Sequence, residues 1–339
     1  MAADSESEPL DEAEQAEGML GVARSVVSTC LAVRREDTVL VITDPMTSTI
    51  ARALYEAAAR ITERLILVMI PPSLKRGAEI PSVVADLMRN ADVIIIATRN
   101  SFTHTRARAN ASREGARVAS MPGIDAEVMA HGMTEDYTAL RREIRGMNSV
   151  FRRRRNVHVT TPAGTDIRFT TGSRWILDDN GLIVRPGAVG NLPAGKIFVL
   201  PQEGTASGTI AIDSTWEGRI LEEPLRFDVE DGLVTSIEGG ELADEIDSIL
   251  ELAKSGLRRS RERAYTLAEF GFGMNSRAKL LGNRLEDQVV RGTAYFSFGD
   301  NTALGGSAKV GVKMSGVMSK PSCTLDDITL ISEGKVTAS

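Results

Sequence analysis

The stretch that decides the fold is Thr38-Val-Leu-Val-Ile-Thr43, which stops at Asp44-Pro45. A short continuous run of β-prone apolar residues with turn residues after it predicts a strand buried on both faces. A helix is expected to begin near Thr47, beyond the proline. A strand that leads into a helix is the repeating unit of a parallel sheet.

The same pattern recurs three times further along the chain. Each of the three β-prone runs is followed by polar or turn-forming residues. The runs occupy residues 64–70, 92–97 and 116–120. Successive strand–helix units imply a parallel sheet with helices on both faces, so residues 1–155 are predicted to form a doubly wound α/β domain.

Ligands of doubly wound sheets usually lie beyond the carboxyl ends of the strands. Here those ends are Asp44, residues 98–101 and residues 121–123. No glycine-rich dinucleotide fingerprint or phosphate loop follows any of these strands, so no nucleotide cofactor is expected. His104 lies just past one strand end and is a candidate substrate-binding residue. A lone histidine at such a place more often caps or hydrogen-bonds a helix start.

The sequence changes character after Asn156. Short β-prone runs separated by turn residues predict three hairpins, and a helix is expected over about 241–255. The hairpins cover residues 157–170, 225–237 and 327–336. Residues 156–339 are therefore predicted to form a second, mostly antiparallel α+β domain.

Composition limits the classes of function. The chain has 339 residues, a formal net charge of −6 and a pI near 5.4, which argue against nucleic acid or an anionic membrane as partners. The two cysteines, Cys30 and Cys323, form no paired motif, so neither a disulfide scaffold nor a thiolate metal site is expected. The chain shows no signal peptide and no apolar run long enough to span a membrane, so a cytoplasmic protein is expected.

Six segments carry motifs in a fixed order along the chain. They are Ser101-Phe-Thr-His-Thr105, Ala119-Ser-Met-Pro-Gly123, Gly190-Asn-Leu-Pro-Ala-Gly195, Glu203-Gly-Thr-Ala-Ser-Gly-Thr209, Ala268-Glu-Phe-Gly-Phe-Gly-Met-Asn275 and Gly292-Thr-Ala-Tyr-Phe-Ser-Phe-Gly-Asp-Asn301. Together they resemble the aminopeptidase T type of metallo-aminopeptidase, a leucyl aminopeptidase-like family that also has a branch of iron-dependent dihydroxypyridine ring-opening dioxygenases. The resemblance runs from about Thr38 onward, and it implies the family's fold and a homodimer.

The resemblance also implies the position of a metal site, and most of the family's metal ligands are replaced by other residues in this chain. This chain has Lys196 where the family has a glutamate ligand, and Tyr295 in place of the histidine of Gly-Thr-x-His. The later His-x-Asp pair is replaced by Lys313 and Ser315, and only Glu269 retains the family residue. Divalent zinc, cobalt or iron needs several anionic or imidazole ligands, and two ammonium groups repel it. No metal and no other cofactor is therefore expected.

The five positions are the catalytic candidates of a metal-independent enzyme: Lys196, Glu269, Tyr295, Lys313 and Ser315. A lysine in a partly dry pocket can act as a general base, an oxyanion partner or an imine-forming nucleophile. The tyrosine can donate to an oxyanion, and the serine can orient a substrate or attack an acyl group. The expected substrate is a small amide, lactam or oxygenated ring compound, and the expected class is hydrolase or lyase.

Two other interpretations stay open. The lysines can fill the abandoned metal site and form a structural Lys196–Glu269 bridge, which leaves a non-catalytic protein that binds an anion or oligomerises. A metal-dependent aminopeptidase with unorthodox ligands is the other possibility. Asp300 and Asn301 are further candidates for substrate binding. They lie in a glycine-rich segment that equally fits a tight turn with positive φ.

Overall fold

The computed structural model describes residues 12–72, 78–147, 150–151, 154–171, 177–255 and 261–337. The chain divides into two compact units: unit 1 comprises Met1–Thr134 and Leu182–Gly190, and unit 2 comprises Glu135–Gly181 and Asn191–Ser339. The units differ from the ranges 1–155 and 156–339 because the chain passes from one unit to the other three times. Those two ranges stay a prediction about domains. Among the described residues, no helix is both long and apolar enough to cross a membrane.

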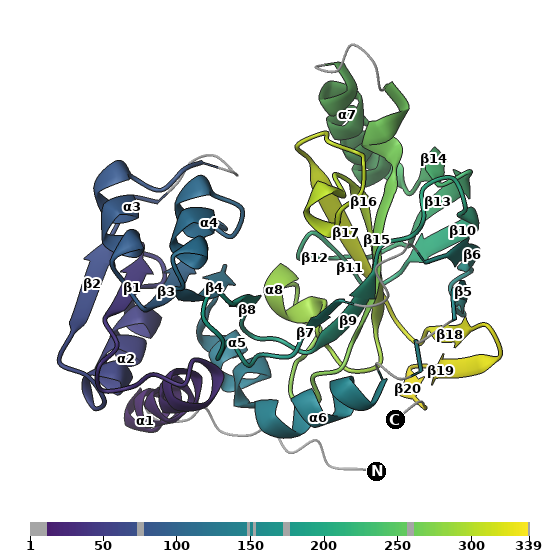
Figure 1. The fold of residues 1–339 in the computed structure, drawn as a ribbon. Coiled ribbons are helices and arrows are strands. Elements are labelled where there is room, and N and C mark those ends of the chain that lie inside the picture. The colour runs from purple at the N-terminus through teal and green to yellow at the C-terminus, as the bar shows by residue number, and fades with distance from the viewer. Residues whose placement is uncertain are drawn as a thin grey trace. The chain divides into compact units, whose positions relative to one another are not determined.

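Unit 1 is built on a five-stranded sheet (Figure 1). Its strands are β1 (Val39–Thr43), β2 (Leu65–Met69), β3 (Val93–Thr98), β4 (Arg117–Pro122) and β8 (Val189–Asn191). The strand order is β2-β1-β3-β4-β8, and β1 pairs in parallel with both β2 and β3. The chain therefore moves outward from β1 in both directions. Because the crossover connections share one handedness, this reversal puts helices on both faces of the sheet.

The helices of unit 1 cover a core of strand side chains. The helices are α1 (Glu12–Ser25), α2 (Ser48–Ala59), α3 (Ser82–Arg89), α4 (Arg106–Arg113) and α5 (Ala126–Ala130), with a π-helical turn at Val26–Cys30 and a 3-10 turn at Gly132–Thr134. Apolar residues of α3 and α4 pack on Leu40, Ile42 and Ile96. Val39 and Val41 point to the opposite face, because side chains alternate along a strand, and α2 contacts β1 there. The predicted doubly wound domain is confirmed.

Strand β2 differs from the other predicted parallel strands in its burial. It lies at the edge of the sheet, where Ile66 and Leu67 are each 40% exposed and Met69 is 56% exposed. The apolar run at 64–70 predicts a strand but does not distinguish an edge strand from a central one. Only the pairing between strands makes that distinction.

The described residues of unit 2 form two antiparallel sheets and three α-helices. The eight-stranded sheet contains β5 (Asn156–Thr160), β6 (Asp166–Thr170), β10 (Ser207–Ile212), β13 (Leu225–Glu230), β14 (Leu233–Glu238), β18 (Ser322–Leu325), β19 (Ile328–Ser332) and β20 (Lys335–Val336). The seven-stranded sheet contains β7 (Leu177–Asp179), β9 (Lys196–Val199), β11 (Thr215–Trp216), β12 (Arg219–Ile220), β15 (Leu267–Gly273), β16 (Ala294–Gly299) and β17 (Lys313–Met318). The helices are α6 (Tyr137–Met147), α7 (Gly240–Ser255) and α8 (Arg284–Asp287), with 3-10 turns at Arg261–Tyr265 and Thr302–Leu304.

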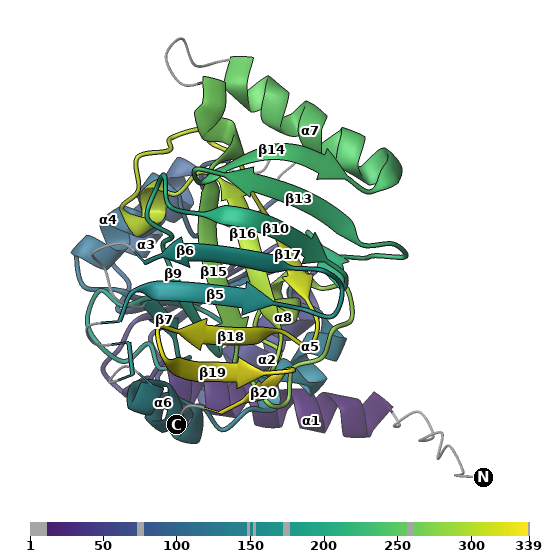
Figure 2. The same cartoon turned by 90° about the vertical axis from the view of Figure 1, so that its right-hand side faces the viewer.

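The two sheets pack face to face through aromatic side chains. The strands of the first sheet run in the order β14-β13-β10-β6-β5-β18-β19-β20 (Figure 2), and those of the second in the order β12-β11-β17-β16-β15-β9-β7. Between them, Phe169 meets Phe270 with ring centroids 5.5 Å apart, and Phe227 stacks on Phe298 at 4.6 Å. The predicted hairpins are β5–β6, β13–β14 and β19–β20. The mostly antiparallel architecture is confirmed.

Candidate functional site

The pairing of four strands places all five catalytic candidates on one face of the seven-stranded sheet. Glu269 lies opposite Ser297, which in turn lies opposite Ser315. Tyr295 and Lys313 precede these two serines by two residues each, so they share the same face. Lys196 pairs with Gly273, which lies four residues after Glu269 on β15, so the side chain of Lys196 lies on this face as well. The five residues that the sequence scatters over more than a third of the chain are therefore neighbours.

Two glycines of the Ala-Glu-x-Gly-x-Gly motif make room on this face. A Cβ atom on Gly271 would lie 2.6 Å from ring atoms of Tyr295, so the ring rests where a side chain would otherwise stand. A Cβ atom on Gly273 would lie 2.0 Å from the carbonyl oxygen of Val290. Both contacts are far inside van der Waals distance, so larger residues would displace the tyrosine or the neighbouring backbone.

Glu269 is the centre of the cluster. It is only 4% exposed, and its two carboxylate oxygens accept hydrogen bonds from the Tyr295 hydroxyl and the Lys313 ammonium. Burial acts to raise the pKa of Glu269, but the charges of Lys313 and Lys196 and these two hydrogen bonds lower it overall. The buried carboxylate is therefore held in its ionised form.

Lys196 has a different partner from the one expected for a structural bridge. Its Nζ donates to Oε1 of Gln288 at 2.9 Å, and the ammonium lies 5.4 Å and 5.0 Å from the ring centroids of Phe198 and Tyr295. The salt bridge to Glu269 is made by Lys313. The expectation of a Lys196–Glu269 bridge was wrong because Lys313, on β17 and two strands away from β15, reaches the carboxylate of Glu269, while Lys196 on the neighbouring strand β9 bonds to Gln288.

Asp179 is a member of the cluster that the sequence did not reveal. Strand β7 pairs with β9 so that Asp179 lies opposite Lys196, and the backbone N–H of Asn191 donates to its Oδ2 at 3.4 Å. Burial raises the pKa of Asp179 to about 6, against the lowering effect of Lys196. Burial also lowers the pKa of Lys196, and the charge of Lys313 adds to this, while Glu269 and Asp179 oppose it. A three-residue strand far from the motifs offers no sequence signal that would identify this aspartate.

Tyr295 and Ser315 are both buried, and their hydroxyls have different partners. Burial raises the pKa of Tyr295, and the adjacent negative charge of Glu269 raises it further, so the tyrosine is a neutral phenol that donates its proton in a hydrogen bond. The Ser315 hydroxyl lies 2.8 Å from that of Ser297, and its backbone N–H donates to Glu217 Oε1 at 2.8 Å. The serine pair therefore links β16 to β17 beside the charged cluster.

His104 belongs to unit 1, whereas the cluster belongs to unit 2. It is exposed, in the turn that precedes α4 in unit 1. The cap of α4 is Thr105, whose side chain accepts from the backbone N–H of Arg108 at 3.3 Å. The histidine is thus not the side chain that caps this helix, and its role in substrate binding stays a prediction.

Asp300 and Asn301 are bound into the loop after β16. Asp300 Oδ2 accepts from the backbone of Val310 at 2.9 Å and of Gly311 at 3.0 Å. Asn301 is 1% exposed, and its Oδ1 accepts from the backbone of Ala308 at 2.8 Å. These bonds hold a tight turn together, in agreement with the turn interpretation of the glycine-rich segment. Substrate contact by these two residues stays a prediction.

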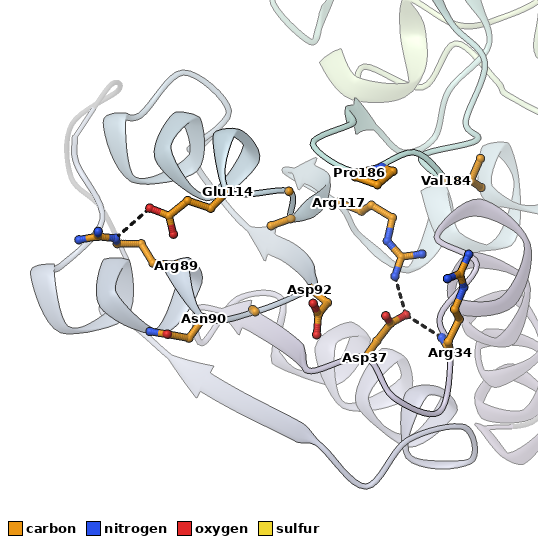
Figure 3. A pocket seen from close by; sticks show the side chains of 12 residues that line it. Arg34, Asp37, Arg89, Asn90, Asp92, Glu114, Arg117, Val184 and Pro186 are labelled. Carbon is orange, nitrogen blue, oxygen red and sulfur yellow. Dashed lines mark hydrogen bonds and ion pairs between the residues drawn. The ribbon is translucent and has the colours of Figure 1, made fainter.

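A cavity of about 410 Å³ lies in unit 1 at the amino ends of the parallel strands (Figure 3). One of its lining residues is Arg117, which donates to the carbonyl oxygens of Leu31 at 2.7 Å and Ala32 at 2.9 Å, and to Asp37 at 2.5 Å. The side chains of Arg117 and Asp37 are 8% and 10% exposed. This ion pair joins the end of the first helical segment to the sheet, so the polar groups at the base of the cavity are used for structure.

The side chains of the cluster in unit 2 do not fit the divalent metal that the resemblance implies. They supply two lysines, a neutral phenol and a serine beside the carboxyl groups of Glu269 and Asp179, and both oxygens of Glu269 already accept hydrogen bonds. Zinc, cobalt and iron sites need several imidazole, thiolate or carboxylate donors. Among the residues that the structure describes, no group of three or more His, Cys, Asp or Glu side chains is arranged to hold a metal ion.

Comparisons with known proteins agree with this fold. The chain is 25% identical over 229 residues to the 2,5-dihydroxypyridine 5,6-dioxygenase of Pseudomonas putida, and the alignment spans 62% of this chain and 62% of that relative. The solved structure of the 2,5-dihydroxypyridine dioxygenase of Pseudomonas putida KT2440 matches with a TM-score of 0.80 and 19% identity, over 98% of this chain and 99% of that one. Wild-type AmpT from Thermus thermophilus matches with a TM-score of 0.64 and 12% identity, over 95% and 99%.

These matches confirm the resemblance to an aminopeptidase T-like family that includes a dioxygenase branch. The two solved structures, at 19% and 12% identity, show the fold alone. The family profile described as NicX, 2,5-dihydroxypyridine 5,6-dioxygenase, matches residues 19–338. Since that range is nearly the whole sequence, the chain belongs to the 2,5-dihydroxypyridine 5,6-dioxygenase family.

Proposed function

We propose that this protein is an enzyme that acts on an oxygenated ring compound by metal-independent acid–base or nucleophilic chemistry at the cluster in unit 2. The substrate class is supported by the family, whose named member acts on a dihydroxypyridine. The observation that carries the proposal is Glu269, a buried carboxylate bonded to the Lys313 ammonium and to the Tyr295 hydroxyl. Side-chain cations and acids stand where the resemblance assigns metal ligands.

Each group has a role that follows from its protonation state. Tyr295, a neutral phenol beside an ionised carboxylate, donates a hydrogen bond or a proton to an oxygen that gains negative charge. Lys313 stabilises that charge as a cation. Lys196, whose pKa burial lowers, is the base or the nucleophile. Asp179, with a pKa of about 6, exchanges a proton near neutral pH.

The class of reaction proposed here differs from the one in the relative's name. A dioxygenase is an oxidoreductase, whereas the groups in this cluster are acids, bases and an amine. We therefore propose a hydrolase or lyase that works on a lactam, amide or enolisable ring. The residues supply proton transfer and addition to a carbonyl carbon, and neither step requires a change of oxidation state.

The test is turnover by protein from which metals have been removed. The purified chain is treated with a chelator, its residual zinc, cobalt and iron are measured by elemental analysis, and it is incubated with 2,5-dihydroxypyridine and a panel of hydroxypyridines and lactams. We expect ring conversion, followed by mass spectrometry, in the metal-free protein. Lys196→Met and Lys313→Met should each lower it at least about 100-fold. Lys309→Met, a change at an exposed lysine, is the matched control.

Two outcomes would contradict the proposal. Turnover that returns only with stoichiometric zinc, cobalt or iron would instead support a metal-dependent aminopeptidase or dioxygenase with unorthodox ligands. Conversion that persists in both lysine variants would show that the reaction takes place elsewhere.

A second candidate is a non-catalytic protein that binds a small anion, because the two oxygens of Glu269 are already satisfied by its neighbours. In that case Lys196→Met and Lys313→Met weaken the binding of a ring carboxylate in calorimetry, while no member of the panel is converted. Conversion of any panel compound by the native protein rejects this candidate.

Three further predictions belong to the same proposal. The partner is a small molecule, as the relatives' names suggest for those proteins, and neither nucleic acid nor membrane is a partner. The chain forms a homodimer in the cytoplasm. Light scattering of the purified protein tests the dimer, because a monomer at micromolar concentration would contradict it.

A further inference from the structure

The two lysines of the cluster have different partners, and this difference separates their roles. Lys313 forms an ion pair with the buried carboxylate of Glu269. Lys196 donates to the neutral amide of Gln288. A lysine paired with a carboxylate is held as a cation, whereas the hydrogen bond from Lys196 to an amide oxygen does not require the amine to carry a charge.

The surroundings of Lys196 favour its neutral form. Burial takes water away from the amine and lowers its pKa, whereas the ring faces of Phe198 and Tyr295, with centroids 5.4 Å and 5.0 Å away, attract the ammonium and offset part of that effect. The charges of Glu269 and Asp179 raise the pKa of Lys196, and those of Lys313 and Arg284 lower it to a smaller extent, so burial is what leaves this pKa lowered. A desolvated lysine next to another cation is a recurring arrangement for an amine that attacks carbonyl carbon.

The position of Tyr295 supplies the acid that such an attack needs. Its hydroxyl is hydrogen-bonded to Glu269, and its ring is the surface on which the Lys196 amine lies. A carbonyl compound on this face would have an amine and a phenol–carboxylate pair close to its reacting carbon. Lys313 provides a positive charge near the developing alkoxide.

We infer that Lys196 is a nucleophilic amine that condenses with the ketone or aldehyde carbonyl of a small planar compound. This inference rests on the proposed function in using the same site, and it adds a covalent step to it. The nitrogen lone pair forms a bond to the carbonyl carbon to give a carbinolamine. Both N–H hydrogens then leave with the former carbonyl oxygen as water, and an imine remains. No atom changes oxidation state, so no oxidant or reductant is required.

The experiment uses 2,4-pentanedione and the full chain. This diketone forms an imine with an unprotonated amine, and the imine tautomerises to a conjugated enaminone that absorbs in the near ultraviolet. Peptide mass mapping locates the adduct. We expect Lys196 to be modified at least about tenfold faster than the exposed Lys309, since a desolvated amine is present more often without its proton.

Two variants control for the fold. Lys196→Arg keeps a cation in place but cannot form the enaminone, so the fast adduct should vanish while the thermal unfolding midpoint stays close to that of the native protein. Lys309→Met should leave the fast adduct unchanged. An adduct that forms on Lys313 first, or on Lys196 no faster than on Lys309, overturns the inference.

This outcome is separable from that of the proposed function. Labelling requires no turnover of a ring compound, so a fast adduct on Lys196 together with no conversion of the panel supports the inference and rejects the proposed substrates. Conversion of the panel without a fast adduct supports the proposed function and leaves Lys196 as a base.

Discussion

Each unit of this protein contains a buried carboxylate paired with a cation, and the two pairs differ in what surrounds them. In unit 1, Arg117 gives its remaining hydrogen bonds to the backbone carbonyls of Leu31 and Ala32. In unit 2, the Lys313–Glu269 pair is surrounded by titratable side chains, among them Tyr295. The other hydrogen-bond partners of Arg117 are therefore backbone groups, which cannot change their charge.

The difference shows how to tell a structural pair from a chemical one. In both pairs a buried carboxylate contacts a cation, so burial and charge alone do not separate them. The two pairs are distinguished by the groups that surround each of them. Around Arg117 these fix the end of a helix, whereas around Glu269 they add an amine, a phenol and an aspartate that can exchange protons.

The largest expected effect is on the pair in unit 1. Arg117→Met should lower the free energy of unfolding by about 3 to 5 kcal/mol, because Asp37 is left as a buried charge without its cation. Chemical denaturation followed by circular dichroism measures it. Adding Asp37→Asn should recover part of the loss, since the amide carries no charge. A loss below about 1 kcal/mol would mean that water reaches the pair and that it is not structural.

The corresponding change in unit 2, Lys313→Met, should lower the free energy of unfolding by less than Arg117→Met does, and it should impair turnover or ligand binding more. Lys313→Met removes a side chain that is 29% exposed, and Lys196 is close enough to act on Glu269 in its place. We expect a loss of about 1 to 3 kcal/mol in unfolding free energy, the typical cost of an unsatisfied buried acceptor. If this variant is instead as unstable as Arg117→Met and equally able to bind or convert ring compounds, the two pairs have the same structural role.

The free energy of unfolding should depend on pH because of Asp179. Burial raises its pKa from the ordinary 3.8 to about 6, so the folded protein binds its proton more tightly than the unfolded chain does. The stability from this group is fully present below about pH 4 and is lost as the pH rises through about 6. Relative to Asp179→Asn, the native protein should therefore lose about 1 to 3 kcal/mol between pH 4 and pH 7.

Denaturation of both proteins at several pH values measures the difference, in which the titration of other groups largely cancels. The groups that act on Asp179 are Lys196, which lowers its pKa, and Asp178, which raises it. A stability difference that does not change with pH would show that Asp179 is ionised throughout and is not the proton-exchanging member of the cluster.

Much of the fold could be predicted because its signals are local. The runs at 38–43 and 92–97 are apolar at every buried position except Thr43, and the hairpin turns carry glycine between short β-prone segments. The edge position of β2 could not be predicted, because it depends on which strands pair and not on composition. The return of residues 182–190 to unit 1 is non-local for the same reason.

Only part of the cluster could be predicted from the sequence. That part came from the sequence motifs more than from residue patterns with a physical explanation. Alternation along β15 and β16 puts Glu269 and Tyr295 on one face once the register is known. The choice of Lys313 over Lys196 as the partner of Glu269 depends on side-chain reach across strands, which a sequence does not contain. Asp179 and Gln288 come from a three-residue strand and from the end of a four-residue helix, and neither belongs to a motif.

The smallest expected effect concerns Ser315, and it tests whether this serine takes part in the chemistry of the cluster or only connects two strands beside it. Its hydroxyl bonds to that of Ser297 at 2.8 Å, so Ser315→Ala should cost about 1 kcal/mol of stability through the loss of one buried hydrogen bond. If Ser315 only links two strands, the turnover or ring binding of the variant should stay within about threefold of the native value, because no group that changes charge has been removed. Ser297→Ala is the matched control, since it removes the other half of the same bond. A loss of turnover of about 100-fold in Ser315→Ala but not in Ser297→Ala would make the serine a nucleophile and extend the chemical region beyond the lysines.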